Sequence, residues 1–155
     1  MTTARLLLLA LLVPLLWTPA AATDSPGRIV PRAGMTIAPL PTDAAVRNGM
    51  LAIRDVVRTN HSLVTHRRMP PDHAQRFAAQ VKIEADRILA KTSLSGDALE
   101  KLRALLADIV SGLGAVARPD EGATALDGLA RADAALARYP QEFDDPTWKP
   151  LQAVE

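Results

Sequence analysis

The chain has 155 residues, of which 18 are Lys or Arg, 17 are Asp or Glu and none is Cys. The lack of cysteine excludes disulfide bonds, thiolate metal sites and covalent haem attachment, so packing must stabilise the fold. The balanced charge leaves no basic excess, and we therefore expect neither nucleic acid nor a generic anionic membrane surface as a partner.

The first segment, residues 1–22, has the pattern of a secretory signal peptide. Arg5 precedes an apolar run at 6–17, and three alanines close the segment. The run is shorter than the roughly 20 apolar residues that a membrane-spanning helix needs. We therefore expect cleavage after Ala22, a mature chain with no membrane span, and a periplasmic or secreted location.

The next segment, residues 23–42, is rich in proline. Pro26, Pro31, Pro39 and Pro41 lie within it. Proline at this density prevents both a helix and a central strand. The segment is predicted to be an extended arm, either a solvated tether or a binding arm.

Residues 43–143 contain four amphipathic segments in which apolar residues recur at three- and four-residue steps. This spacing places the apolar residues of each segment on one helix face, and the short connections favour antiparallel neighbours. The sequence therefore predicts an all-α fold, an up-down-up-down antiparallel four-helix bundle. The predicted helices run from Asp43 to Arg68, from Pro71 to Lys91, from Ser95 to Arg118, and from Asp120 to Arg138 with an optional bent turn past Tyr139.

The last segment, residues 144–155, contains Pro146 and Pro150 and is predicted to be an irregular tail. Its one aromatic residue, Trp148, is expected to fold back onto the end of the bundle, where the ring can be covered.

Two stretches of the chain resemble the soluble periplasmic b-type cytochromes and cytochromes c-prime, a superfamily of four-helix bundles. They are NGMLAIRDVV at 48–57 and ARADAALARYPQEF at 130–143. In the b-type family a first-helix Met and a fourth-helix His ligate the haem iron, so the resemblance implies Met50 as a haem ligand. The second position falls near Pro140, where the chain has no imidazole. The ending FDDPTW at 143–148 is also similar to that of uncharacterised exported proteobacterial proteins.

All three histidines of the chain lie in one window together with a methionine. The cluster consists of His61, His66, Met69 and His73. Imidazole and thioether ligands suit copper, which makes the cluster a candidate copper site. His61 and His66 do not share a helix face, whereas His66 and Met69 can meet and His73 can return across the turn. The alternative is an exposed helix end with solvated histidines, His61 being packed at the core edge.

A carboxylate, Asp133, interrupts the apolar seam of the fourth segment. A carboxylate at such a position is costly unless it is paired. The predicted bundle places it near Arg54 and Glu84, so we expect an ion pair with Arg54 or Arg131. The alternative is a carboxylate site for metal or proton chemistry, although Glu84 lacks the histidine three residues later that dinuclear carboxylate bundles use.

No catalytic motif is readable in the chain: G-x-S-x-G, P-loop and HExxH patterns are absent. Gly112 and Gly114 follow no strand, so they predict close helix packing or a helix-end distortion rather than a phosphate site.

We therefore expect a non-enzymatic exported binding or accessory protein with an unknown protein or small-molecule partner and no cofactor. The alternative is a metal- or haem-handling bundle that uses Met50 or the histidine cluster. If Met50 is not a ligand, we expect it to fill the core. A homodimer through an outer helix face remains open.

Overall fold

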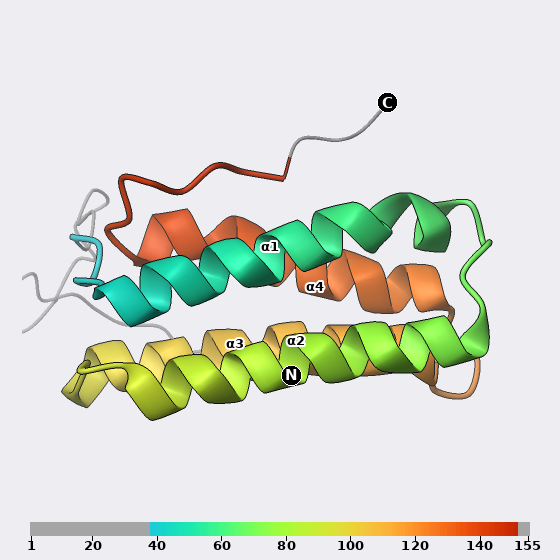
Figure 1. Ribbon diagram of the computed structural model, residues 1–155, viewed down its shortest axis with the longest axis horizontal. Coiled ribbons are helices and arrows are strands. Elements are labelled where there is room, and N and C mark those ends of the chain that lie inside the picture. Colours follow the sequence, from blue (N-terminus) through green and yellow to red (C-terminus); the bar gives the residue numbers. More distant parts are fainter. Residues whose placement is uncertain (1–37, 152–155) are drawn as a thin grey trace, which may run out of the picture. The chain divides into compact units, whose positions relative to one another are not determined.

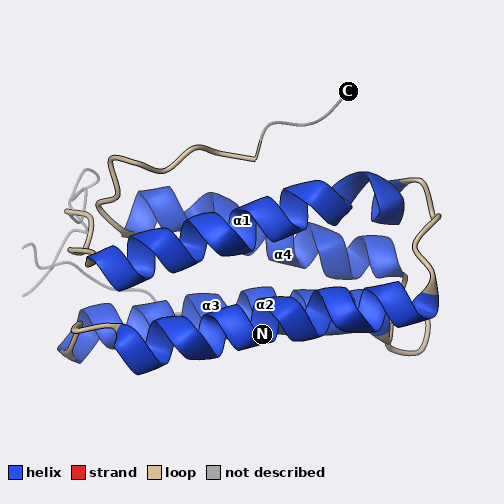
Figure 2. Ribbon diagram, in the orientation of Figure 1, coloured by secondary structure: helices blue, strands red, loops and turns tan. Residues whose placement is uncertain are grey.

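The computed structural model describes residues 38–151, and within this range it contains four α-helices and no β-strand (Figures 1 and 2). The fold is therefore an all-α four-helix bundle, as predicted. All four helices belong to the unit Thr36–Glu155. The predicted signal peptide and residues 23–37 of the predicted arm lie outside the described residues. The helices are α1 (Ala44–Thr65), α2 (Pro71–Lys91), α3 (Gly96–Ala117) and α4 (Ala125–Glu142).

Helix α1 ends at Thr65, so the predicted end at Arg68 is wrong. The N–H of Arg68 donates to the carbonyl of Leu63 at 2.8 Å, and the N–H of Arg67 donates to that of Val64 at 2.9 Å. These two bonds form a Schellman motif, which needs a left-handed residue after the helix. Arg67 is that residue, with φ of 54°. The helix therefore ends without the glycine that usually marks such a stop.

Helix α4 begins at Ala125, so the predicted start at Asp120 is also wrong. A left-handed glycine, Gly122 with φ of 78°, first turns the chain. The hydroxyl of Thr124 then accepts from the N–H of Asp127 at 3.3 Å, and the Asp127 carboxylate accepts from the N–H of Thr124 at 2.7 Å. This reciprocal capping box fixes the first turn of the helix.

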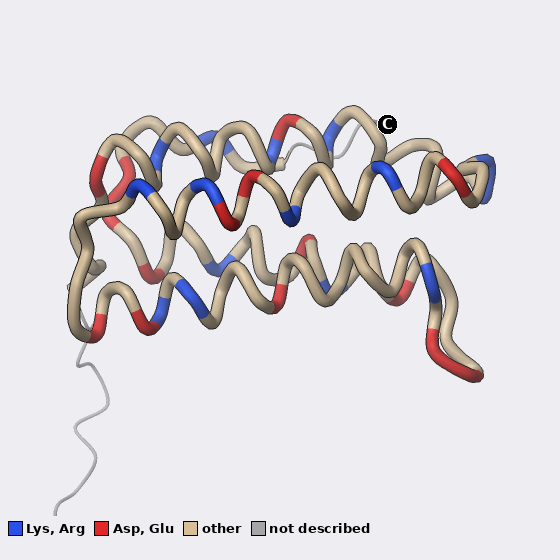
Figure 3. Tube along the Cα trace, turned by 60° about the horizontal axis from the view of Figure 1, so that its bottom comes forward, with Lys and Arg blue, Asp and Glu red and all other residues tan. Residues whose placement is uncertain are grey.

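The core is made from one apolar face of each helix, as the spacing predicts. On α3 the buried face also includes Leu105, which is fully buried, whereas Leu99 is only half-buried. Lys, Arg, Asp and Glu positions are distributed along the helices, with both signs of charge present (Figure 3). The largest fully buried side chains are Tyr139, Phe77, Phe143, Met50, Ile53, Ile88, Leu102, Leu105, Leu106, Ile109, Leu113 and Leu136.

Helices α3 and α4 approach each other through glycine. A Cβ atom built on Gly112 lies 2.8 Å from the carbonyl oxygen of Gly128, and one built on Gly128 lies 2.6 Å from that of Gly112. Backbone therefore faces backbone at this crossing, and only glycine leaves enough room. The prediction of close helix packing at Gly112 is confirmed, whereas Gly114 meets nothing within 4 Å.

The segments before α1 and after α4 lie side by side. Leu40 forms an isolated parallel bridge with Phe143 through two hydrogen bonds of 2.8 Å. The chain then runs back along α1 and α4 (Figure 1). Trp148 folds back onto the bundle, as predicted, with its ring centroid 4.7 Å from that of Tyr139. It packs along the helices rather than over their ends, because Arg54 of α1 lies 5.8 Å from its ring.

None of the helices that the structure describes combines the length and the apolar character required to cross a membrane.

Candidate functional site

The end of the bundle where α1 stops and α4 begins contains a pocket of about 380 Å³, here called the end pocket. Each of the four helices contributes to its wall, and the α1–α2 and α3–α4 connections contribute the rest. This volume falls within the range typical of small-molecule sites. The lining residues are Leu63, Val64, Arg67, Met69, Ala74, Val116, Thr124, Ala125 and Leu126.

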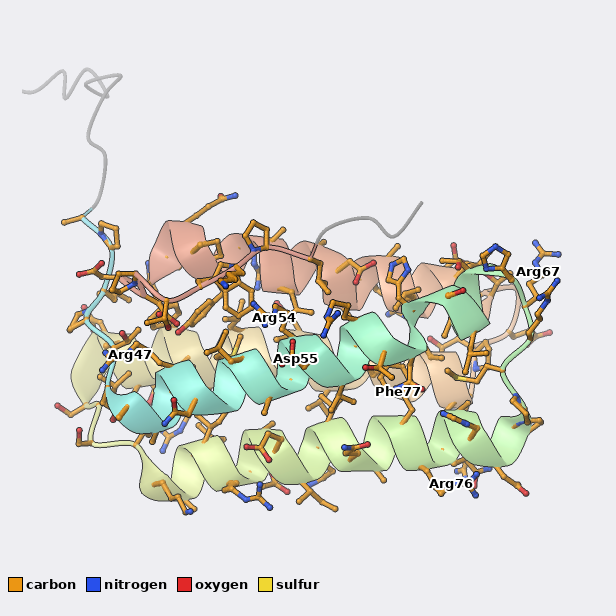
Figure 4. The ribbon with its side chains drawn as sticks, turned by 45° about the horizontal axis from the view of Figure 1, so that its top comes forward. Arg47, Arg54, Asp55, Arg67, Arg76 and Phe77 are labelled. Atoms are coloured by element: carbon orange, nitrogen blue, oxygen red, sulfur yellow. The ribbon has the colours of Figure 1, made fainter. Side chains whose placement is uncertain are left out.

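Seven of the nine lining residues of the end pocket are apolar, and the polar ones are Thr124 and Arg67. The hydroxyl of Thr124 donates to the carboxylate of Asp127 at 2.8 Å, so it is already engaged in the capping box. Arg67 is exposed at the end of the bundle (Figure 4), and its guanidinium forms no hydrogen bond or ion pair within residues 38–151. The end pocket therefore combines an apolar wall with one available cation.

Two of the four predicted copper ligands lie near this pocket but in different surroundings. Met69 lines the end pocket and packs against the core, as a partly buried apolar side chain. His66 is exposed, and its Nδ1 lies 2.8 Å from the carbonyl oxygen of Ser62, to which it donates. The histidine is thus turned toward its own helix.

A third predicted ligand, His61, is bound across the bundle to Asp133 of α4. Its Nε2 lies 3.0 Å from Oδ2 of Asp133, and both side chains are half-buried. The other carboxylate oxygen of Asp133 is buried and has no hydrogen-bond partner in the described part of the chain. The predicted pairing of Asp133 with Arg54 or Arg131 is wrong: within residues 38–151 Asp133 pairs with His61, and Arg54 pairs with its neighbour in the chain, at 2.7 Å.

The fourth predicted ligand, His73, joins α2 to α1. Its Nε2 donates to Oδ1 of Asn60 at 2.7 Å, and Nδ2 of Asn60 donates to the carbonyl of Val56 at 2.8 Å. Each histidine thus has a separate partner, and residues 38–151 contain no group of three or more His, Asp or Glu arranged to hold a metal ion. The copper site stays a prediction.

Met50, the residue that the cytochrome resemblance implies as a haem ligand, is fully buried within the core. The matching region of α4 offers Tyr139, whose hydroxyl donates to Asp145 at 2.9 Å. Burial, together with this hydrogen bond, raises the pKa of Tyr139 far above its ordinary value. The phenol is therefore neutral and structural, and the assignment of Met50 to haem stays a prediction.

At the opposite end of the bundle, the carboxylate of Asp43 links α1 to the α2–α3 connection. Although burial raises the pKa of Asp43, hydrogen bonds from the N–H groups of Val46 and Ser93 and from the hydroxyls of Thr92 and Ser93 lower it to about 2. Asp43 thus caps α1 and also binds the α2–α3 connection, where its Oδ2 accepts from Ser93 at 2.6 Å and from Thr92 at 2.8 Å. This end has a structural role, and the end pocket is the stronger candidate for function.

The end pocket was not predicted from the sequence. Its apolar residues are readable, since Leu63, Met69 and Leu126 flank the predicted turns, but which connections meet depends on the three-dimensional arrangement. No family model, curated protein or solved structure matches the chain. The relationship to the cytochrome superfamily stays a prediction, and the end pocket is the feature on which a functional proposal can rest.

Proposed function

We propose that the protein is a non-enzymatic, exported binding protein whose helical bundle holds a small apolar ligand in the end pocket. The observation that carries this proposal is the end pocket itself, with a volume of about 380 Å³ and a lining that is apolar apart from one arginine and one threonine. Export rests on the leader-like pattern at residues 1–22.

Burial of the apolar wall would supply the driving force for binding. Removing apolar surface from water is favourable by roughly 25 cal/mol per Å². A ligand that covers Leu63, Met69 and Leu126 would gain this energy without exposing the core, because the buried faces of the helices stay packed below. The few polar groups at the rim would then select among ligands.

We also infer that the helices alternate in direction, in the up-down-up-down order. The end pocket brings the last turns of α1 and α3 next to the first turns of α2 and α4. At the other end, Asp43 before α1 binds Ser93 between α2 and α3. Short connections at alternating ends support this order.

Methionine methyl signals offer a direct test of ligand binding. Met69 lines the end pocket, whereas Met50 is fully buried in the core. In protein labelled with ¹³C at the methionine methyls, titration with 1-decanol should shift the Met69 signal in a saturable way. The Met50 signal should move less, since it lies away from the pocket.

A pocket-filling variant provides the matched control for this titration. Ala125 lines the end pocket, while Ala130 lies exposed on the same helix. Ala125→Phe should abolish the decanol-dependent shift of Met69, and Ala130→Phe should preserve it. If neither decanol nor any other apolar probe of similar size, neutral or charged, shifts the Met69 signal in the parent protein, the proposal is overturned.

The metal- and haem-handling alternative is tested on the same purified material by its metal content and visible spectrum. Stoichiometric copper that falls when His66 and Met69 are changed to Ala would favour that alternative. A Soret band lost in Met50→Ala would favour a haem protein instead.

A further inference from the structure

We propose that the ligand of the end pocket carries a single anionic head group, as in a medium-chain monocarboxylate, and that Arg67 binds this head group. The inference rests on the proposed function, because it names the class of ligand that the same pocket would hold. Two independent features of Arg67 support it: its isolated charge and its backbone conformation.

The charge of Arg67 is available to a ligand. It is the one charged residue among the described residues that line the end pocket. Asp127, which follows the lining residue Leu126 in sequence, accepts from both the N–H and the hydroxyl of Thr124. No ion pair joins it to Arg67 in the described range. An apolar body with one negative end is the chemical complement of such a site, and guanidinium groups bind carboxylates through two parallel hydrogen bonds.

The backbone of Arg67 indicates that the side chain has a use beyond ending α1. With φ of 54°, this residue occupies the left-handed position of the Schellman motif, with hydrogen bonds of 2.8 and 2.9 Å on either side. A side chain is disfavoured at this position, and glycine is the residue most often found there. Non-glycine residues held in this conformation are concentrated at functional sites. Arginine at 67 thus places a cation at the rim of the pocket, although glycine would adopt this turn with less strain.

The substitution Arg67→Gly separates the charge from the turn, because glycine accepts the same φ and keeps both hydrogen bonds. In the parent protein at low ionic strength, decanoate below its micelle-forming concentration should bind about tenfold or more tightly than 1-decanol, read from the Met69 shift. In Arg67→Gly this preference should fall to near unity while decanol binding persists. Arg67→Lys should retain part of the preference.

A control for general electrostatics is Arg68→Gln, which removes an equal charge one residue away. Arg68 is exposed and does not line the end pocket, so the preference for decanoate should survive. The inference is overturned if Arg67→Gly keeps the preference, or if Arg68→Gln loses it to the same extent. Equal binding of decanol and decanoate by the parent protein would overturn the inference and leave the proposed function standing. Failure of both probes would overturn the proposed function itself.

Discussion

The α3–α4 crossing and the end of α1 make opposite use of a position that favours glycine. At the crossing, Gly112 and Gly128 allow two backbones to touch, with a built Cβ only 2.6 Å from the facing carbonyl. At the end of α1, the left-handed position is occupied by Arg67. The first region is optimised for packing. The second has a less favourable turn and leaves a charge beside an apolar pocket, as the proposed binding function would require.

The largest expected effect concerns the α3–α4 crossing. Gly128→Ala should lower the free energy of unfolding by about 3 kcal/mol, because the added methyl meets rigid backbone and the helices must separate. Gly114→Ala is the matched control, since a Cβ there meets nothing within 4 Å. It should be stabilising by up to about 1 kcal/mol through helix propensity alone. Urea unfolding of both variants measures the two changes, and equal changes in the free energy of unfolding would refute the close crossing.

The next effect concerns Asp43, at the end away from the pocket. Its pKa is lowered from 3.8 to about 2 in the folded protein. A lowered folded-state pKa contributes stability that is present above about pH 4 and is lost as the pH falls toward 2. Asp43→Ala should therefore lower the free energy of unfolding by about 1 to 2 kcal/mol at pH 6 and by much less at pH 2. A penalty independent of pH would show that the carboxylate charge is not involved.

A smaller effect is expected where α1 meets α4. His61→Ala removes the one hydrogen-bond partner that Asp133 has within residues 38–151, where its other oxygen is buried without a partner. The free energy of unfolding should fall by about 1 kcal/mol, with some of the loss recovered in the double variant that also carries Asp133→Ala. The control His66→Ala should change stability little, because His66 is exposed. Thermal unfolding of these variants and of the single variant Asp133→Ala measures the changes, and additive effects in the double variant would argue against the pair.

The smallest effect sharpens the comparison between glycine and arginine. Arg67→Gly should leave the free energy of unfolding unchanged or raise it by up to about 1 kcal/mol, since the left-handed conformation costs glycine less. Denaturant unfolding of the parent and the variant measures the difference directly. A clear loss of stability would mean that the arginine side chain supports the fold, and its placement would then need no ligand.

Much of the fold could be predicted from the sequence because helix periodicity and proline are local signals. The bounds of α2 are confirmed at both ends, where Pro71 begins the helix and Lys91 ends it. The end of α1 was missed because a Schellman stop without glycine leaves no mark in the sequence. The start of α4 was missed for another reason: the Thr124–Asp127 capping box is readable, but the acidic residues before it also suggest a first turn.

The candidate site was less predictable than the fold. Clustering in sequence suggested that His61, His66 and His73 act together, yet each faces a different partner. His61 on α1 faces α4, His66 turns back to the last turn of α1, and His73 on α2 reaches α1. The pocket wall comes from residues more than 50 positions apart, such as Leu63 and Leu126. Only the packing of the four helices brings them together.

The position of Trp148 gives the protein an optical property. The chain has two tryptophans, and the other, Trp17, lies in the predicted leader. In the protein without that leader, tryptophan fluorescence would come from Trp148 alone, whose indole nitrogen is buried against the bundle. Detachment of residues 144–151 would bring the ring into water and shift its emission to longer wavelength. The tail can thus be followed separately from the helices, whose loss is read by circular dichroism.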